Sequence, residues 1–293
     1  RNYLRIKMNE KFTTVIQPKN GWFDLHLKEL LQYRDLIFLF VKRNFVSQYK
    51  QTVLGPLWAI IQPLLTTVVF TLVFGNIAGL AAEGVPSFIF YLSGTILWTY
   101  FNQCLTQTAN TFVSNRATLG KVYFPRLVMP ISTVISNLIS LAIQFVFMVI
   151  FLVYYVITDQ GCHPNLYILM TPLIILQLAL LSLGCGIIIS SMTTKYRDLQ
   201  LLLSFFVQLW MYATPIVYPL AEVHGQFLGI NINTLICLNP ITPIIKTFRY
   251  GFFDVGDFMG WGWLIYSFLF SAIILFIGII VFNRREKNFM DNV

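Results

Sequence analysis

Charged residues are scarce in this chain, and they are unevenly placed. They make up 11% of the 293 residues. None of them lies within six long apolar stretches, which cover residues 57–80, 85–115, 127–158, 165–194, 199–221 and 258–283. A charged side chain at bilayer depth is costly and usually marks an ion pathway or a proton relay. Their absence argues against transport driven by a proton or ion gradient, so any transport would draw its energy from another source.

The sequence also lacks the usual signatures of metal, disulfide and nucleotide sites. The three histidines are far apart, and the four cysteines form no CxxC pair. Cys162 and Cys237 would face the same side of a membrane, either as a disulfide or as two unrelated thiols. No GxxxxGK[ST] phosphate loop occurs. We therefore expect a chain that is not an enzyme and that itself binds no metal and no cofactor.

What the chain has in abundance is apolar sequence, at 57% of its residues. Each of the six stretches exceeds the roughly 20 residues that a spanning helix needs, and barrel strands would be shorter and alternating. The sequence therefore predicts an all-α integral membrane protein with six transmembrane helices. If both termini are cytoplasmic, every Lys and Arg except Lys246 and Arg249 falls on the inner side, as short loops generally require.

This topology divides the chain into a cytoplasmic N-terminal region (1–56), a transmembrane domain (57–283) and a cytoplasmic tail (284–293). Residues 227–253 are moderately apolar, but Pro240 and Pro243 interrupt their helical pattern. A seventh span there would also place the basic tail outside. We expect a re-entrant helical hairpin at about 218–253, and the alternative is an ordinary outer loop that lies on lipid.

A basic amphipathic helix precedes the first span. Its apolar face is predicted from Phe38, Val41, Phe45 and Tyr49, and the opposite face from Arg43, Ser47 and Lys50. Gly55 and Pro56 then break the helix before Trp58. Such a helix can anchor the chain in the membrane interface or dock a partner protein, and the sequence supports both readings.

The second span is unusually polar. Thr95, Thr99, Asn102, Thr106 and Asn110 follow helical spacing and form one stripe. The stripe can be the wall of a hydrated path that hydrogen-bonds sugar hydroxyls, or it can hold helices together, as Thr and Asn often do in membranes. Further along the chain, Gly184 and Gly186 are expected to allow close helix packing.

Four segments, in this order, resemble the permease subunits of ABC exporters that move O-antigen, capsule or teichoic acid. They are RDLIFLFVKRNFVSQYKQTVLGPLWAIIQPLL (34–65), MTTKYRDLQ (192–200), TPIVYP (214–219) and LNPITPII (238–245). The resemblance implies a homodimer of six-helix subunits in the bacterial inner membrane. It also implies two separate nucleotide-binding subunits, which would hold ATP and Mg.

The resemblance further implies roles for particular regions. The helix before the first span would be an interface helix against the ATPase, and residues 115–126 would form a coupling helix. Contacts with the ATPase are therefore expected at Leu54, Gly55, Asn115, Arg116 and Lys121. The outer gate would contain Pro215, Pro219, Pro240 and Pro243. Aromatic rings of the first and fifth spans would line the channel, and the candidates are Trp58, Phe70, Phe74, Phe206, Trp210 and Tyr212. If the polar stripe is the wall of a hydrated path, Thr99, Asn102 and Thr106 would line the channel as well.

The leading hypothesis is export of a lipid-linked, O-antigen-like polysaccharide through this permease. Basic side chains near the cytoplasmic end could attract the phosphates of the lipid carrier; they are Arg34, Lys42, Arg43, Lys50, Arg116, Lys121 and Arg126. Membrane lipids are the other expected partner, and nucleic acid is not. Two alternatives remain: an ABC-type drug or lipid exporter permease, and, more remotely, a membrane-embedded enzyme that modifies glycans.

Overall fold

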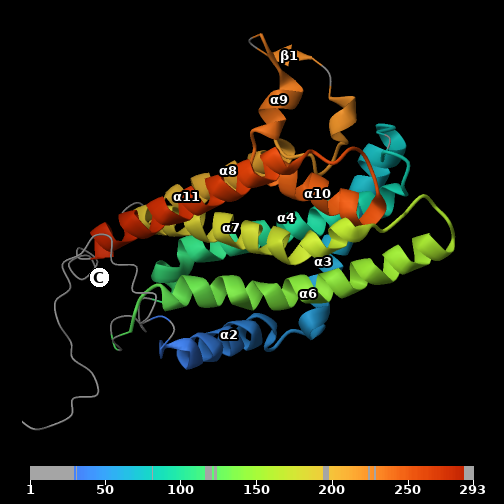
Figure 1. The fold of residues 1–293 in the computed structure, drawn as a ribbon. Coiled ribbons are helices and arrows are strands. Elements are labelled where there is room, and N and C mark those ends of the chain that lie inside the picture. The colour runs from blue at the N-terminus through green and yellow to red at the C-terminus, as the bar shows by residue number, and fades with distance from the viewer. Residues whose placement is uncertain are drawn as a thin grey trace, which may run out of the picture.

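The structure is a computed structural model. Helices form nearly all of the part of the chain that it describes (Figure 1). It describes residues 30, 32–80, 82–115, 121, 124–193, 198–223, 225–227 and 229–286. Most of the long helices run roughly alongside one another, and a small hairpin with a short helix projects from one side of them. The prediction of an all-α fold class is therefore confirmed for this part of the molecule, apart from one hairpin of two-residue strands.

The first described helix, α2 (Arg34–Tyr49), packs along the first half of α6 (Val128–Ile157) (Figure 1). Phe40 is buried against the ring of Phe124, with the ring centroids 5.6 Å apart. Phe38, which was predicted to lie on the apolar face of this helix, is 69% exposed. The apolar face of α2 is therefore centred near Phe40 and Val41, because α6 and not a flat lipid surface selects the packed residues.

A sharp turn separates α2 from the first apolar stretch. Gly55 has φ +53, a left-handed conformation that glycine adopts without steric cost. It opens η1 (Gly55–Leu57), which leads into α3 (Trp58–Phe70) and the π-helical η2 (Thr71–Ile77). The chain therefore does turn at Gly55 and Pro56, but α2 already ends at Tyr49, ahead of the predicted break.

The centre of the molecule is formed by α4 (Ser87–Ser114), α6 and α7 (Thr171–Thr193), with η3 (Leu166–Met170) leading into α7. A Cβ on Gly186 would come within 2.6 Å of Thr108, and a Cβ on Gly184 would come within 2.7 Å of the backbone of Leu275. These distances are too short for a side chain. Gly184 and Gly186 therefore do allow close packing, of α7 on α11 (Trp261–Glu286) and on α4.

The chain leaves the bundle after α8 (Leu199–Tyr212). It passes through η4 (Leu220–Glu222) and a hairpin of two short strands, β1 (Gln226–Phe227) and β2 (Ile230–Asn231), to α9 (Ile232–Cys237). It then returns as α10 (Ile241–Phe253), most of whose side chains are buried. Two helices with Pro240 between them are thus present where a hairpin was predicted.

Four helical segments are long and apolar enough to cross a membrane: Gly55–Ile77, Val128–Ile157, Leu166–Thr193 and Trp261–Arg284. Helix α4 has sufficient length at 28 residues, but its polar stripe lowers its hydropathy. Helix α8 is apolar but has only 14 residues, because the chain turns before Pro215. Six spans therefore remain a prediction, of which four are supported by length and composition.

Candidate functional site

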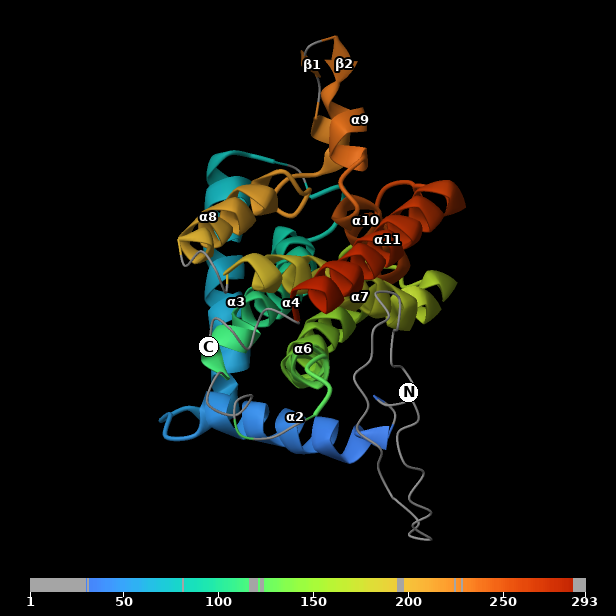
Figure 2. The ribbon, with the colours of Figure 1, turned by 90° about the vertical axis from the view of Figure 1, so that its left-hand side faces the viewer.

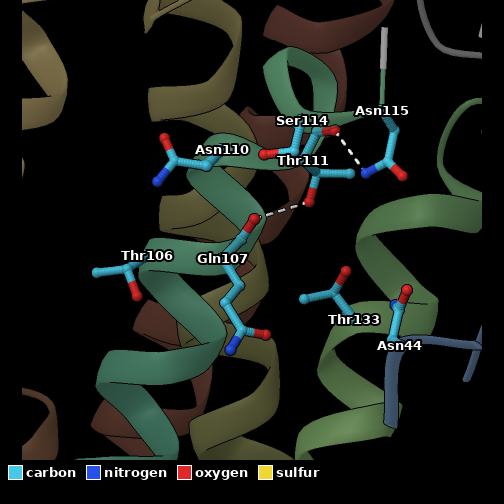
Figure 3. Close-up of a pocket in the computed structure, with 8 residues that line it drawn as sticks. All are labelled: Asn44, Thr106, Gln107, Asn110, Thr111, Ser114, Asn115 and Thr133. Carbon is cyan, nitrogen blue, oxygen red and sulfur yellow. Dashed lines mark hydrogen bonds between the residues drawn. The ribbon is translucent and has the colours of Figure 1, made fainter. Parts of the chain in front are cut away.

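A pocket of about 350 Å³ lies where α2, α4 and α6 meet. All eight residues that line it have uncharged polar side chains: Asn44, Thr106, Gln107, Asn110, Thr111, Ser114, Asn115 and Thr133. Figure 3 shows five of them near the end of α4 and Asn115 directly after it. Thr133 of α6 and Asn44 of α2 lie on the side of α4 toward which Thr111 points, whereas Thr106 and Asn110 extend from the other side. In a chain so rich in apolar residues, such a lining is a concentrated set of hydrogen-bonding groups.

The helical period of α4 explains the lining. Thr106 and Asn110 are four residues apart, as are Gln107 and Thr111, so each pair lies on one side of the helix. The Thr106 hydroxyl donates to the carbonyl of Asn102 at 2.7 Å, and the Thr111 hydroxyl donates to the carbonyl of Gln107 at 2.9 Å. Each hydroxyl oxygen therefore keeps its acceptor capacity for a ligand.

The side-chain amides of Gln107 on α4 and Asn137 on α6 form a hydrogen bond between these two helices. Asn137 donates through Nδ2 to Oε1 of Gln107 at 3.0 Å, and this bond fixes the Gln107 side chain between the helices. Oδ1 of Asn110 is buried and has no hydrogen-bond partner among the described residues. A buried acceptor without a partner costs about 1–3 kcal/mol, so a donor on a bound molecule would stabilise this arrangement.

One cation reaches the edge of the pocket. Nη2 of Arg43 donates to Oδ1 of Asn115 at 2.9 Å and to Oδ1 of Asn44 at 3.2 Å, and both asparagines line the pocket. The same guanidinium lies 4.6 Å from the centroid of the Phe40 ring. Arg43 thus adds a positive charge at the rim, while the interior of the pocket is neutral.

The residues predicted to line a channel are distributed over several surfaces. Thr106 belongs to the polar pocket. Phe70 and Phe74 contact each other, and Trp210 donates through Nε1 to Asn239 at 3.2 Å; all three pack on the core. Thr99 and Asn102 are half-buried on α4. Trp58, Phe206 and Tyr212 are exposed on α3 and α8, which lie on the same side of the molecule in Figure 2. A shared channel stays a prediction.

The predicted phosphate-attracting and ATPase-contacting residues are mostly on the surface. Arg34, Lys42, Lys50 and Lys121 are exposed, and Arg34 forms an exposed ion pair with Asp35. Arg126 is half-buried, and Leu54 is exposed beside the Gly55 turn. Arg116 lies outside the described residues. Of the residues in this set that the structure describes, Arg43 and Asn115 are the two that it brings to the polar pocket.

A second pocket, of about 590 Å³, lies between η3 and the end of α10. Its polar groups bond to one another: Asn165 donates to the carbonyl of Tyr250 at 2.9 Å and to Oδ1 of Asp254 at 3.1 Å. The Asn165 Oδ1 accepts from the backbone nitrogen of Tyr167. Because these bonds hold η3 against α10, we assign this pocket a structural role.

The sequence pattern of the ABC-2 type transporter family matches residues 35–253 of this chain, which is most of its length. The chain belongs to the ABC-2 type transporter family. The matched range includes every residue that lines the polar pocket.

Curated relatives of this ABC-2 transporter chain have related names. The "O-antigen export system permease protein RfbA" of Myxococcus xanthus is 25% identical over 273 residues, which cover 91% of this chain and 98% of the relative. A Klebsiella pneumoniae protein of the same name is 26% identical, with 88% and 94% covered. The "Polysialic acid transport protein KpsM" of Escherichia coli is 23% identical, with 84% and 91% covered. The sequence-based assignment to a polysaccharide exporter permease agrees with these names.

The four proline residues predicted for the gate of this ABC-2 chain are all buried. The carbonyl of Pro215 accepts a hydrogen bond from Arg249, and the carbonyl of Pro240 accepts one from Ser267. Sequence reasoning assigned Arg249 only to the outer side and gave it no role. It also passed over Asn44, Gln107, Thr111, Ser114 and Thr133 as site residues. The i, i+4 spacing along α4 could have indicated Gln107 and Thr111, whereas the others depend on helix packing.

Proposed function

We propose that this chain is the permease subunit of an ABC transporter that exports a cell-surface polysaccharide, driven by a separate ATPase subunit. Membership of the ABC-2 family and the names of the O-antigen and polysialic acid relatives support the class. The sequence contains no phosphate loop, which is consistent with hydrolysis of ATP by a partner subunit.

The observation that carries the choice of substrate is the lining of the polar pocket. Its eight side chains offer hydroxyl and amide groups only, and these match the donors and acceptors of neutral sugar rings. The pocket volume of about 350 Å³ is within the range of roughly 300–1,000 Å³ that is common for small-ligand sites. A hydrocarbon chain would leave these groups without partners, so the pocket favours a glycan over a lipid or a hydrophobic drug.

The glycan is proposed to be attached to a lipid diphosphate and to approach from the cytoplasmic leaflet. Arg43 at the pocket rim can form charge-assisted hydrogen bonds to phosphate, and the exposed Lys42 and Lys50 on α2 add long-range attraction. The ATPase would contact α2, the Leu54–Gly55 turn and the chain after Asn115. In this account, both termini are cytoplasmic and the membrane is the bacterial inner membrane.

Two copies of the chain are proposed to form the channel. Helices α3 and α8 expose apolar and aromatic side chains, among them Trp58, Phe206 and Tyr212. Facing copies would bring these rings to one central path. The α9–α10 hairpin would be the outer gate, re-entering the membrane between the fifth and sixth spans. Burial of α10 supports this, because helical interruptions at membrane depth have to be covered by protein.

The proposal is tested by deleting the gene and complementing it with wild-type protein. Loss of surface polysaccharide, accumulation of lipid-linked glycan inside the cell and restoration by the wild type are expected. The tagged chain is also expected to co-purify with a nucleotide-binding protein. A deletion strain with normal surface polysaccharide and new sensitivity to hydrophobic compounds would instead establish a drug or lipid exporter.

A further inference from the structure

Arg249 of α10 is buried in the interior of the molecule, with 4% of its surface exposed. Four hydrogen bonds hold its guanidinium. Nη1 donates to the carbonyl of Pro215 at 2.7 Å, Nη2 donates to the carbonyls of Ile216 at 2.9 Å and Phe90 at 3.2 Å, and Nε donates to the Ser93 hydroxyl at 3.4 Å. Four of the five guanidinium donors are therefore used.

The acceptors come from two different parts of the chain. Phe90 and Ser93 belong to α4, whereas Pro215 and Ile216 belong to the turn that follows α8. The guanidinium carbon also lies 3.6 Å from the centroid of the Phe90 ring, which adds a cation–π contact. All four oxygen atoms that accept hydrogen bonds from Arg249 are uncharged. One side chain thus ties α10 to both α4 and the end of α8 through neutral oxygen acceptors.

The sequence of α4 leaves room for this side chain. A Cβ on Gly94 would lie 2.7 Å from Nη2 of Arg249 and 3.1 Å from Cγ2 of Ile216. Any larger residue at position 94 would displace the guanidinium or the turn after α8. The absence of a side chain at Gly94 therefore leaves the space that the guanidinium occupies.

We propose that Arg249 is a positioning residue that holds the outer gate of this transporter closed. The inference rests on the proposed function, since that function makes the α9–α10 hairpin a gate. Any opening that moves α10 away from the end of α8, or from α4, breaks several Arg249 bonds together. A lysine would keep the charge but would lose the planar fork that reaches acceptors on two segments at once.

The test uses full-length protein with its ATPase partner in proteoliposomes that contain a small polar dye. Arg249→Lys and Arg249→Met are compared with wild type in the absence of ATP. We expect roughly tenfold faster dye efflux from both variants, because tenfold corresponds to about 1.4 kcal/mol, which is within the contribution of one charge-assisted hydrogen bond. The matched control is Lys246→Met, which removes a half-buried cation from the same helix and should leave efflux unchanged.

A second variant covers the case in which Arg249→Met fails to fold. Gly94→Ala keeps the charge but crowds the guanidinium, so it should raise efflux in the same direction. The proposal is overturned if vesicles with Arg249→Lys and vesicles with Gly94→Ala retain dye as well as wild-type vesicles do. This holds even if wild-type vesicles export glycan with ATP, because that export supports the proposed function and not the role of Arg249. Wild-type vesicles that export no glycan would count against the proposed function, while the efflux comparison would still decide the role of Arg249.

Discussion

The hydroxyl of Thr106 offers the sharpest test of the polar pocket. Thr106 lines the pocket, and its hydroxyl donates to the carbonyl of Asn102 within the same helix. Thr106→Val replaces the hydroxyl by a methyl group of similar size and removes one acceptor for a sugar hydroxyl. The helix keeps its backbone hydrogen bonds, so we expect a loss in folding stability of less than about 1 kcal/mol.

The expected effect on transport follows from the worth of one neutral hydrogen bond. Such a bond contributes about 0.5–1.5 kcal/mol, and each 1.4 kcal/mol corresponds to about tenfold in affinity. Thr106→Val should therefore raise the glycan concentration needed for half-maximal ATP-driven export by about twofold to tenfold.

Thr108→Val is the matched control, because it makes the same change one half-turn away on α4. The Thr108 hydroxyl is buried without a hydrogen-bond partner among the described residues, and the side chain contacts Gly186 of α7. Its removal should leave export kinetics unchanged. The reasoning is refuted if both variants export like wild type, or if Thr108→Val is impaired as strongly as Thr106→Val.

Three further predictions concern packing and thiol chemistry. Gly184→Ala should lower the free energy of unfolding by about 1–3 kcal/mol through overpacking. Gly262 has open space around it, so Gly262→Ala should be neutral or stabilising. Equal melting temperatures of the two variants in detergent would contradict this prediction. Phe40→Ala should cost about 3–5 kcal/mol, while the exposed Phe38→Ala should not; the reverse order in thermal unfolding would disprove the packing of α2. Burial raises the pKa of the Cys162 thiol, so maleimide labelling at pH 8 should be slower than in the unfolded protein and should accelerate with rising pH; fast labelling at pH 7 would exclude this.

Helix positions were predictable because they depend on local patterns. The apolar stretch 127–158 corresponds to α6 (Val128–Ile157), and 85–115 corresponds to α4 (Ser87–Ser114). Helix α8 ends at Tyr212, well before the predicted limit at 221, because Pro215 and Pro219 break the helical hydrogen-bonding pattern. The two prolines therefore indicated the earlier end of α8, whereas the extent of the apolar stretch alone overestimated the length of this helix.

The site was less predictable because it depends on which helices meet. The polar stripe of α4 contains Thr106 and Asn110, but the sequence could not show that Asn44 of α2 and Thr133 of α6 would join them. Arg249 illustrates the same limit. Charge counting places it on one side of a membrane, yet its burial arises from carbonyl groups more than 30 residues away and from the space beside Gly94. Such contacts have no local signature.

The most direct measurement is glycan export into vesicles that contain the purified chain, with and without its ATPase partner. The account predicts ATP-dependent accumulation of glycan only when both proteins are present, and no accumulation when the partner is inactivated. Accumulation with this chain alone and no nucleotide would contradict the claim that it is a passive path opened by a separate motor.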